Sequence, residues 1–139
     1  MIALAFRRAV EAVVRRMGWP EFLRVALTST SWDGAAYSTT SATLIDLNSV
    51  FGVPRGVKAV LAGIAIRDSG SLTSRVYAQL GPANGQWALA PETSGLPIDS
   101  IRELLGIVPC DSDGNIYYSV TASGVGTMDI WIKIWGYWR

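Results

Sequence analysis

The run from residue 128 to 138 imposes the strongest constraint on how this chain can fold. Three isoleucines alternate there with bulkier or charged side chains, Ile130, Ile132 and Ile134 with Trp131, Lys133 and Trp135. A two-residue period places successive side chains on opposite faces of an extended strand. The run therefore predicts a strand whose isoleucines face a core and whose tryptophans share the other face.

From residue 28 onward, short runs of this kind recur between turn residues. Residues 57–67 carry apolar or small side chains on both faces, which predicts a central strand covered on both sides. Residues 75–80 follow the turn 68–71, so we expect the two runs to form an antiparallel pair. Residues 44–47 and 86–90 are shorter strand candidates. About seven or eight strands at this spacing predict an antiparallel β-sandwich or jelly-roll over residues 28–139.

Two segments of this domain are predicted to form a helix or a turn rather than a strand. Residues 98–105 fit a helical turn or two, because Asp99 can cap and Ile101, Leu104 and Leu105 can face inward. Asp113–Gly114 predicts a tight hairpin turn before the strand candidate at 115–120. A calcium loop starting at Asp111 is disfavoured, because the glutamate that an EF-hand needs at its twelfth position is Ala122 here.

Residues 1–27 form a separate segment with a helical period. Its apolar stripe consists of Ile2, Phe6, Val10, Val13 and Met17. The helix should end near Gly18-Trp19-Pro20, because glycine ends helices and the residue before proline avoids the α region. A short helical or extended piece, residues 21–27, then leads into the body. We expect this segment to serve attachment or oligomerisation.

Charge separates the same two regions. Residues 1–27 hold five arginines and two glutamates, a net charge of +3, whereas residues 28–139 carry a net charge of −2. A surplus of +3 is small for a nucleic-acid-binding arm, so we expect this helix to contact protein rather than nucleic acid. The apolar stretch before Arg7 is far shorter than a bilayer span, which argues against membrane insertion.

The composition favours an oligomer and disfavours catalysis. Apolar residues make up 50% of the chain and charged residues 17%, so a monomer would leave apolar surface exposed. The chain has no histidine, which removes the commonest general base and metal ligand, and one cysteine, Cys110. No pair of carboxylates stands out from turn and cap positions. The sequence therefore predicts a non-enzymatic protein without a cofactor or metal.

Aromatic residues are the remaining functional candidates. The chain has six tryptophans, and three of them lie with Tyr137 in the last nine residues. Trp131, Trp135, Tyr137 and Trp138 could bind sugar rings, with Lys133 contacting hydroxyl groups. The alternative is that this face is buried in a subunit interface or against the N-terminal helix, and the apolar composition favours such burial.

Four runs of the chain resemble small structural proteins of tailed bacteriophages, of the fibre, tail-tip or head-decoration type. The runs are residues 45–47, 53–61, 66–71 and 129–137, the last reading Asp-Ile-Trp-Ile-Lys-Ile-Trp-Gly-Tyr. The resemblance implies a virion component made in the host cytoplasm, commonly a homotrimer that contacts other virion proteins. It brings no catalytic residues. The alternative function is a lectin-like module that recognises cell-surface glycan.

Overall fold

The structure, a computed structural model, describes residues 3–9, 18–70 and 73–139. Its eight strands form two antiparallel sheets, which confirms the prediction of a mainly β chain with seven or eight strands. Residues 3–9 are helical, so a short N-terminal helix is also confirmed. Residues 21–27, expected to be helical or extended, are extended and lie in strand β1, Pro20–Leu27.

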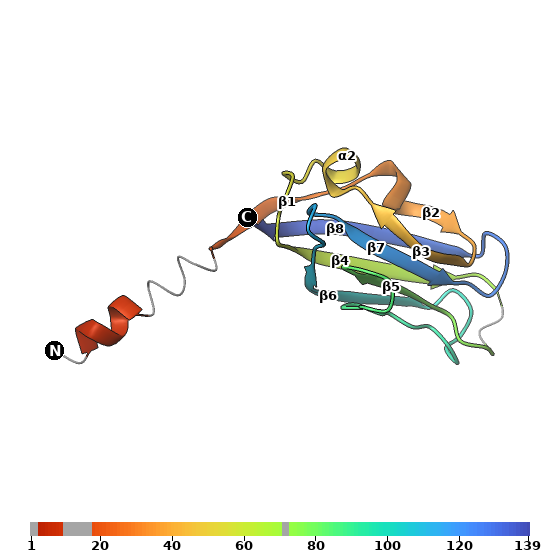
Figure 1. Cartoon of the computed structure of the whole chain (residues 1–139). Helices are drawn as coiled ribbons and strands as arrows, with labels where there is room; N and C mark the ends of the chain where they lie inside the picture. The colour runs from red at the N-terminus through yellow and green to blue at the C-terminus, as the bar shows by residue number, and fades with distance from the viewer. Residues whose placement is uncertain (1–2, 10–17, 71–72) are drawn as a thin grey trace.

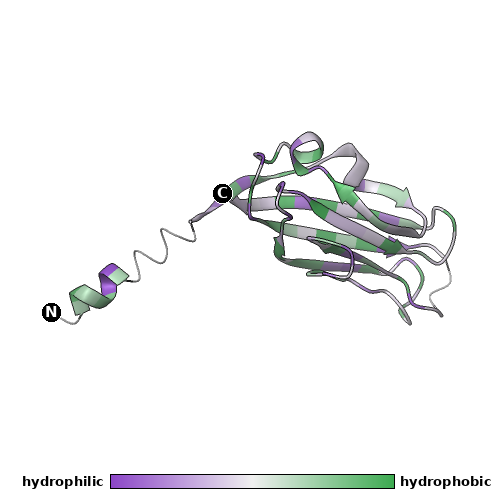
Figure 2. Ribbon diagram, viewed as in Figure 1, coloured by the Kyte–Doolittle hydropathy of each residue, from purple (hydrophilic) through white to green (hydrophobic). Residues whose placement is uncertain are grey.

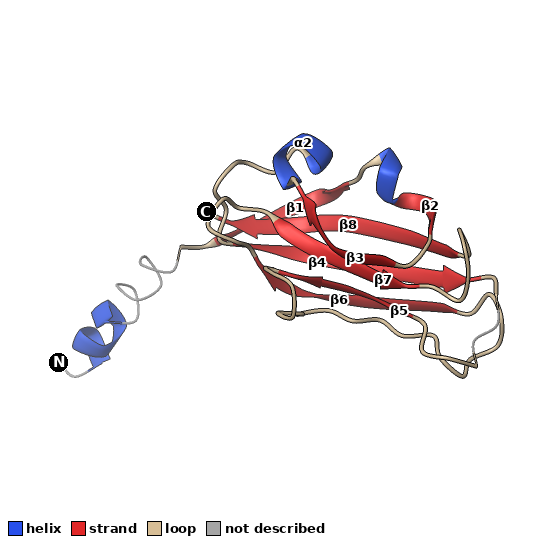
Figure 3. Cartoon of the chain, turned by 45° about the vertical axis from the view of Figure 1, so that its right-hand side comes forward, coloured by secondary structure: helices blue, strands red, loops and turns tan. Residues whose placement is uncertain are grey.

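The larger sheet has the strand order β1-β8-β4-β6, with β2 also pairing with β8 (Figure 1). The bounds are β2 Asp33–Tyr37, β4 Ala59–Asp68, β6 Ile101–Pro109 and β8 Met128–Trp138. The smaller sheet has the order β3-β7-β5, with β3 Thr40–Ile45, β5 Tyr77–Gly81 and β7 Ile116–Thr121. A 3-10 helix η1 (Thr30–Trp32) precedes β2, and a short helix α2 (Leu47–Phe51) follows β3 (Figure 3).

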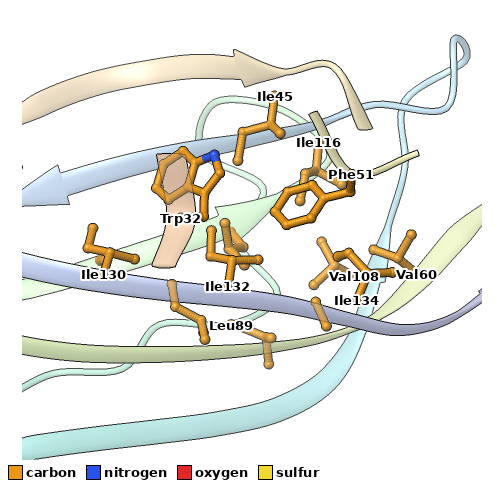
Figure 4. Close-up of a cluster of buried hydrophobic side chains, with 14 of the residues drawn as sticks. Trp32, Ile45, Phe51, Val60, Leu89, Val108, Ile116, Ile130, Ile132 and Ile134 are labelled. Atoms are coloured by element: carbon orange, nitrogen blue, oxygen red, sulfur yellow. The ribbon is translucent and has the colours of Figure 1, made fainter. Parts of the chain in front are cut away.

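The hydrophobic core lies between the two sheets. Ile130, Ile132 and Ile134 of β8 point into it and are at most 1% exposed. Ile45 and Ile116 of the smaller sheet point toward them from the other side (Figure 4). Apolar residues recur along the strands of both sheets (Figure 2). The isoleucine face predicted for the last strand is therefore confirmed.

β4 occupies the predicted central position, between β8 and β6. Its core face is fully buried, whereas the opposite face, which carries Leu61, Ala65 and Arg67, stays partly exposed. The expected pairing of this strand with residues 75–80 is wrong. β5 pairs with β7 in the other sheet, and β4 pairs instead with β6.

The helical prediction for residues 98–105 is wrong, because residues from Ile101 onward form strand β6. Asp99 does not cap a helix. Its φ of +64° is left-handed, and its N–H donates to the Asp68 carbonyl at 3.0 Å, which turns the chain into β6. Nine consecutive residue pairs then join β6 to β4. Tertiary pairing outweighs the local helical pattern here.

The Asp113–Gly114 turn is present, but the predicted hairpin is wrong. The turn connects β6 of one sheet to β7 of the other, so the flanking strands do not pair. The Asp111 carboxylate accepts hydrogen bonds from the N–H groups of residues 113 and 115, each at 2.9 Å. Gly114 adopts φ +81°, and a Cβ there would lie 2.6 Å from the Gly56 nitrogen.

The two shorter strand candidates are only partly correct. Residues 44–47 do not form one strand, since β3 ends at Ile45 and α2 begins at Leu47. Asp46 caps α2, its carboxylate accepting a hydrogen bond from the Ser49 N–H at 3.1 Å. Residues 86–90 form isolated bridges, Leu80 with Leu89 and Ala83 with Gln86, rather than a named strand.

Candidate functional site

The outer face of the larger sheet carries a pocket of about 230 Å³. Six residues from three adjacent strands line it: Gly63 and Ala65 of β4, Glu103 of β6, and Trp131, Lys133 and Trp135 of β8. The sequence placed the three β8 residues on one face, and the structure brings them together there. The pocket therefore has two indole walls, a floor of small residues and one charge of each sign.

Trp131 is a fixed wall of this pocket. Its indole lies against Gly34, where a Cβ would come within 3.0 Å of the indole nitrogen. The Arg67 guanidinium lies 5.5 Å from the ring centroid and is held by Asp129, with 2.6 Å between Nη2 and Oδ2. This hydrogen-bonded ion pair also raises the pKa of Arg67. Trp131 is thus packed between a glycine and a cation, which restricts its rotation.

Trp135 forms the other wall, on the same face as Trp131, and it is the extra residue of a β-bulge. The β4 partners of β8 shift there: Ala62 is opposite Ile134, but Leu61 is opposite Gly136. Trp135 remains 36% exposed. A Cβ on Gly63 would lie 3.7 Å from the Trp135 indole nitrogen and 3.7 Å from Leu105 Cδ1, so glycine leaves the pocket floor open. Bulges of this kind redirect side chains beside functional surfaces.

The bulge separates the four C-terminal aromatic residues. Beyond it the alternation reverses, so Tyr137 turns toward the core and is only 8% exposed. Trp138 is partly exposed at the end of the strand, opposite Ala59, and does not line the pocket. Of the predicted aromatic set, Trp131 and Trp135 meet in one site, whereas Tyr137 and Trp138 lie outside it.

Exposed apolar side chains surround the pocket on the same face. We call this set the outer patch. It consists of Phe22 of β1, Trp135 of β8, and Ile101, Leu105 and Ile107 of β6, which are 36–69% exposed. Their strand partners, such as Gly136 for Phe22 and Gly63 for Leu105, place them on the outer side of the sheet. Contiguous exposed apolar side chains typically mark an interaction surface.

Sequence reasoning missed the β6 contribution to this patch. The helix predicted over residues 98–105 would place Glu103 and Leu105 on different faces, whereas β6 places both on the outer face of the sheet. The available signal was the spacing of Ile101, Glu103, Leu105 and Ile107 at two-residue intervals, followed by Pro109.

The N-terminal stripe is only partly within the structure. Phe6 lies in the helical segment and is 70% exposed, and the other residues of that segment are exposed as well. Ile2, Val10, Val13 and Met17 lie outside the described residues. Phe6 is therefore available to a partner.

Two ionisable groups away from the pocket, the buried Asp68 and the partly buried Cys110, have shifted pKa values. Asp68 has no exposed surface. Burial alone would raise its pKa, but hydrogen bonds from Ser123, Gly70 and Thr127 outweigh burial and lower the pKa below that of an ordinary aspartate. Burial and the nearby Asp111 raise the pKa of Cys110 to about 12, which keeps the thiol protonated at neutral pH. Neither group is poised for chemistry.

Over residues 3–9, 18–70 and 73–139, the structure shows no cluster of three or more potential metal ligands. Within the same residues, no helix has the length and apolarity that a bilayer crossing requires.

Comparison of the whole chain with known proteins gave no matching family model and no significant match among curated proteins.

Proposed function

We propose that this chain is a non-enzymatic structural subunit that assembles with copies of itself and with other proteins of a virion. The outer patch is the observation that carries the proposal. Its five apolar side chains share one sheet face and are open to solvent in the single chain. Apolar area on this scale stabilises an assembly when a second subunit covers it. Catalysis is not needed to explain such a surface.

The strand order supports a finer description of the fold, an eight-stranded jelly-roll sandwich. In a jelly roll, the first strand pairs with the last, the second with the seventh, the third with the sixth and the fourth with the fifth. The chain has the pairs β1 or β2 with β8, β3 with β7, and β4 with β6. The bridges of Leu89 with Leu80 and of Glu92 with Tyr77 supply the fourth pair. Jelly rolls serve in viral capsids and in lectins, an analogy of fold alone.

The virion setting rests on the resemblance to tailed-phage structural proteins. In this proposal the protein is a homotrimer, and the N-terminal segment, residues 1–27, contributes to attachment or trimerisation. The exposure of Phe6 supports that role. The near-neutral net charge of +1 lets copies approach one another without strong repulsion.

The mass of the full chain in solution tests the proposal. Light scattering should give a multiple of 15.0 kDa at micromolar concentration. Phe22→Lys places a charge in the outer patch and should shift the mass toward the monomer. Val125→Lys is the matched control, because Val125 is 93% exposed in a loop outside the patch. A wild-type chain that stays monomeric at high micromolar concentration would contradict the proposal.

Removal of residues 1–17 tests the role of the N-terminal segment separately. The described core residues all lie between Trp32 and Tyr137, so the shortened chain should still fold. We expect the circular dichroism spectrum to remain that of a β protein, while the number of subunits in each particle, measured by light scattering, falls. An unchanged number of subunits would show that this segment is not an oligomerisation element.

Carbohydrate binding is the second candidate, and the pocket favours it. Two indole walls match the apolar faces of a sugar ring, while Lys133 and Glu103 offer a donor and an acceptor for its hydroxyl groups. Titration with a panel of oligosaccharides should quench tryptophan fluorescence, and Trp135→Ala should abolish the response. Trp87→Ala, outside the pocket, is the control. If no sugar responds at millimolar concentration, this candidate is discarded.

A further inference from the structure

The edges of the two sheets are protected unequally. The registers of β1, β2 and β3 are each interrupted by a shift, and Leu89 and Glu92 form bridges along the open side of β5. Irregular or covered edges prevent another strand from adding. β6 has neither protection. It pairs with β4 without a shift, and within the described residues no strand or bridge lies on its other side.

The backbone groups that β6 presents at this edge follow from its register. Pro109 lies opposite Ala59, and the Cys110 N–H donates to the Lys58 carbonyl at 2.9 Å. Since proline has no N–H, the even-numbered residues of β6 form the hydrogen bonds to β4. The odd-numbered residues therefore direct their N–H and C=O groups away from the sheet. These residues are Ile101, Glu103, Leu105 and Ile107.

The same residues carry the exposed apolar side chains of the strand. Ile101, Leu105 and Ile107 are 60%, 62% and 56% exposed, and Leu104 on the other face is 40% exposed. An incoming strand would thus find free hydrogen-bonding groups and apolar side chains along one regular edge. This combination is typical of sheets that extend by strand addition.

We propose that β6 pairs with β6 of a second copy of this chain, antiparallel about a two-fold axis at Leu105, so that the larger sheets of two subunits become continuous. Because a trimer has no two-fold axis, this contact joins subunits of two different trimers. The inference rests on the proposed assembly function and names the partner and the contact. Its test is separate from the Phe22→Lys test of the outer patch, because strand pairing uses backbone groups at the β6 edge, whereas Phe22 lies on β1 at the opposite edge of the sheet.

Charge favours this register over those centred on the three preceding residues. β6 has two charged residues, Arg102 and Glu103. An axis at either of them would set like charges directly opposite each other, which is destabilising, and an axis at Leu104 would make the two Glu103 carboxylates diagonal neighbours. An axis at Leu105 instead places Leu105 opposite its own copy and Glu103 opposite Ile107 of the second copy. Arg102 then faces Val108 of the second copy.

Amide hydrogen exchange of the full chain, followed by NMR at low and high protein concentration, tests the pairing. The amides of residues 103, 105 and 107 should exchange at least tenfold more slowly in the assembled state. The amides of 104, 106 and 108 are bonded to β4 in both states and serve as the internal control. Packing through side chains alone would not produce this alternation.

A proline tests the same contact in a variant. Leu105→Pro removes an N–H that β4 does not use, so the fold should persist while self-association weakens at least tenfold. If the proline variant does not fold, Leu105→Lys is used in its place. This variant sets two lysines opposite each other across the contact and should weaken self-association in the same way. Val25→Lys, on the β1 edge, should leave the association unchanged.

The outcomes separate this inference from the proposed function. If the wild-type chain assembles but the odd-numbered amides stay unprotected, or if Leu105→Pro and Leu105→Lys both retain the wild-type mass, the β6 pairing is refuted and the assembly function stands. If the wild-type chain is monomeric at all concentrations, both fail. Alternating protection together with loss of association in the variants supports the pairing.

Discussion

Replacement of Asp68 by asparagine should strongly destabilise the fold at neutral pH. Asp68 ends β4, and its carboxylate accepts hydrogen bonds from the Gly70 N–H at 2.8 Å, the Ser123 N–H at 3.0 Å, the Thr127 hydroxyl at 3.1 Å and the Ser123 hydroxyl. It therefore joins β4 of the larger sheet to the connection between β7 and β8. Asparagine keeps one acceptor oxygen and places an NH₂ group against donors.

The magnitude follows from the bonds lost. A hydrogen bond to a charged group contributes about 1.5–3 kcal/mol, and the amide loses about two of them, so Asp68→Asn should lower the free energy of unfolding by about 3 kcal/mol. The urea midpoint should fall by roughly 1–3 M. Trp32, which is 5% exposed in the core, provides the fluorescence signal. All variants are compared at one protein concentration, because self-association adds to the apparent stability.

The pH dependence gives an independent readout. Because folding lowers the pKa of Asp68, its carboxylate contributes fully above the unfolded pKa of about 3.9 and loses that contribution as pH falls through the lower folded value. The difference between wild type and Asp68→Asn should therefore shrink below about pH 4. Asp113→Asn, in an exposed turn, should change stability by less than about 0.5 kcal/mol. A loss below about 1 kcal/mol for Asp68→Asn at pH 7, or an equal pH slope in both proteins, would refute this reasoning.

Three further substitutions or reactions test other parts of the fold. Thr93 is fully buried, and its hydroxyl has no hydrogen-bond partner within the described residues. Thr93→Val should therefore raise the free energy of unfolding by about 1 kcal/mol. A lower urea midpoint for this variant would contradict the prediction. Gly81→Ala would bring its Cβ onto the Gln86 carbonyl backbone and should cost about 3 kcal/mol or more, measured in the same denaturation assay. Cys110, with its pKa raised to about 12, should react with iodoacetamide at pH 8 at least ~100-fold more slowly than glutathione, and urea should restore the rate.

Local alternation predicted the parts of this fold that depend on one strand alone. The isoleucines of β8 form the core, and Trp131 and Trp135 share the outer face, because a strand buried on one side must keep its period. The sequence could not show which strands pair. The turn at residues 68–71 indicated a hairpin, but Asp68 binds the distant Ser123 and the chain crosses to the other sheet.

Two features of the site depend on contacts that single-strand patterns do not encode. The bulge at Trp135 reverses the faces of the following residues, so Tyr137 is buried although simple alternation from Trp135 would expose it. β6 carries a helical spacing at Ile101, Leu104 and Leu105, and only its pairing with β4 makes it a strand. Tertiary partners far along the chain decided both outcomes.

The position of β8 has a consequence for how the chain is made. This strand comprises residues 128–138, yet it pairs with β1, β2 and β4. While the ribosome synthesises the chain, β1 and β2 have no partner in the larger sheet until those residues emerge. Because β2 ends at Tyr37 and β8 begins at Met128, their apolar side chains stay unpaired in the nascent chain while about 90 further residues are made, and chaperones can bind them during that time. Folding of the larger sheet therefore depends on the synthesis of this strand, and a ribosome that stalls shortly before residue 128 leaves β1 and β2 unpaired.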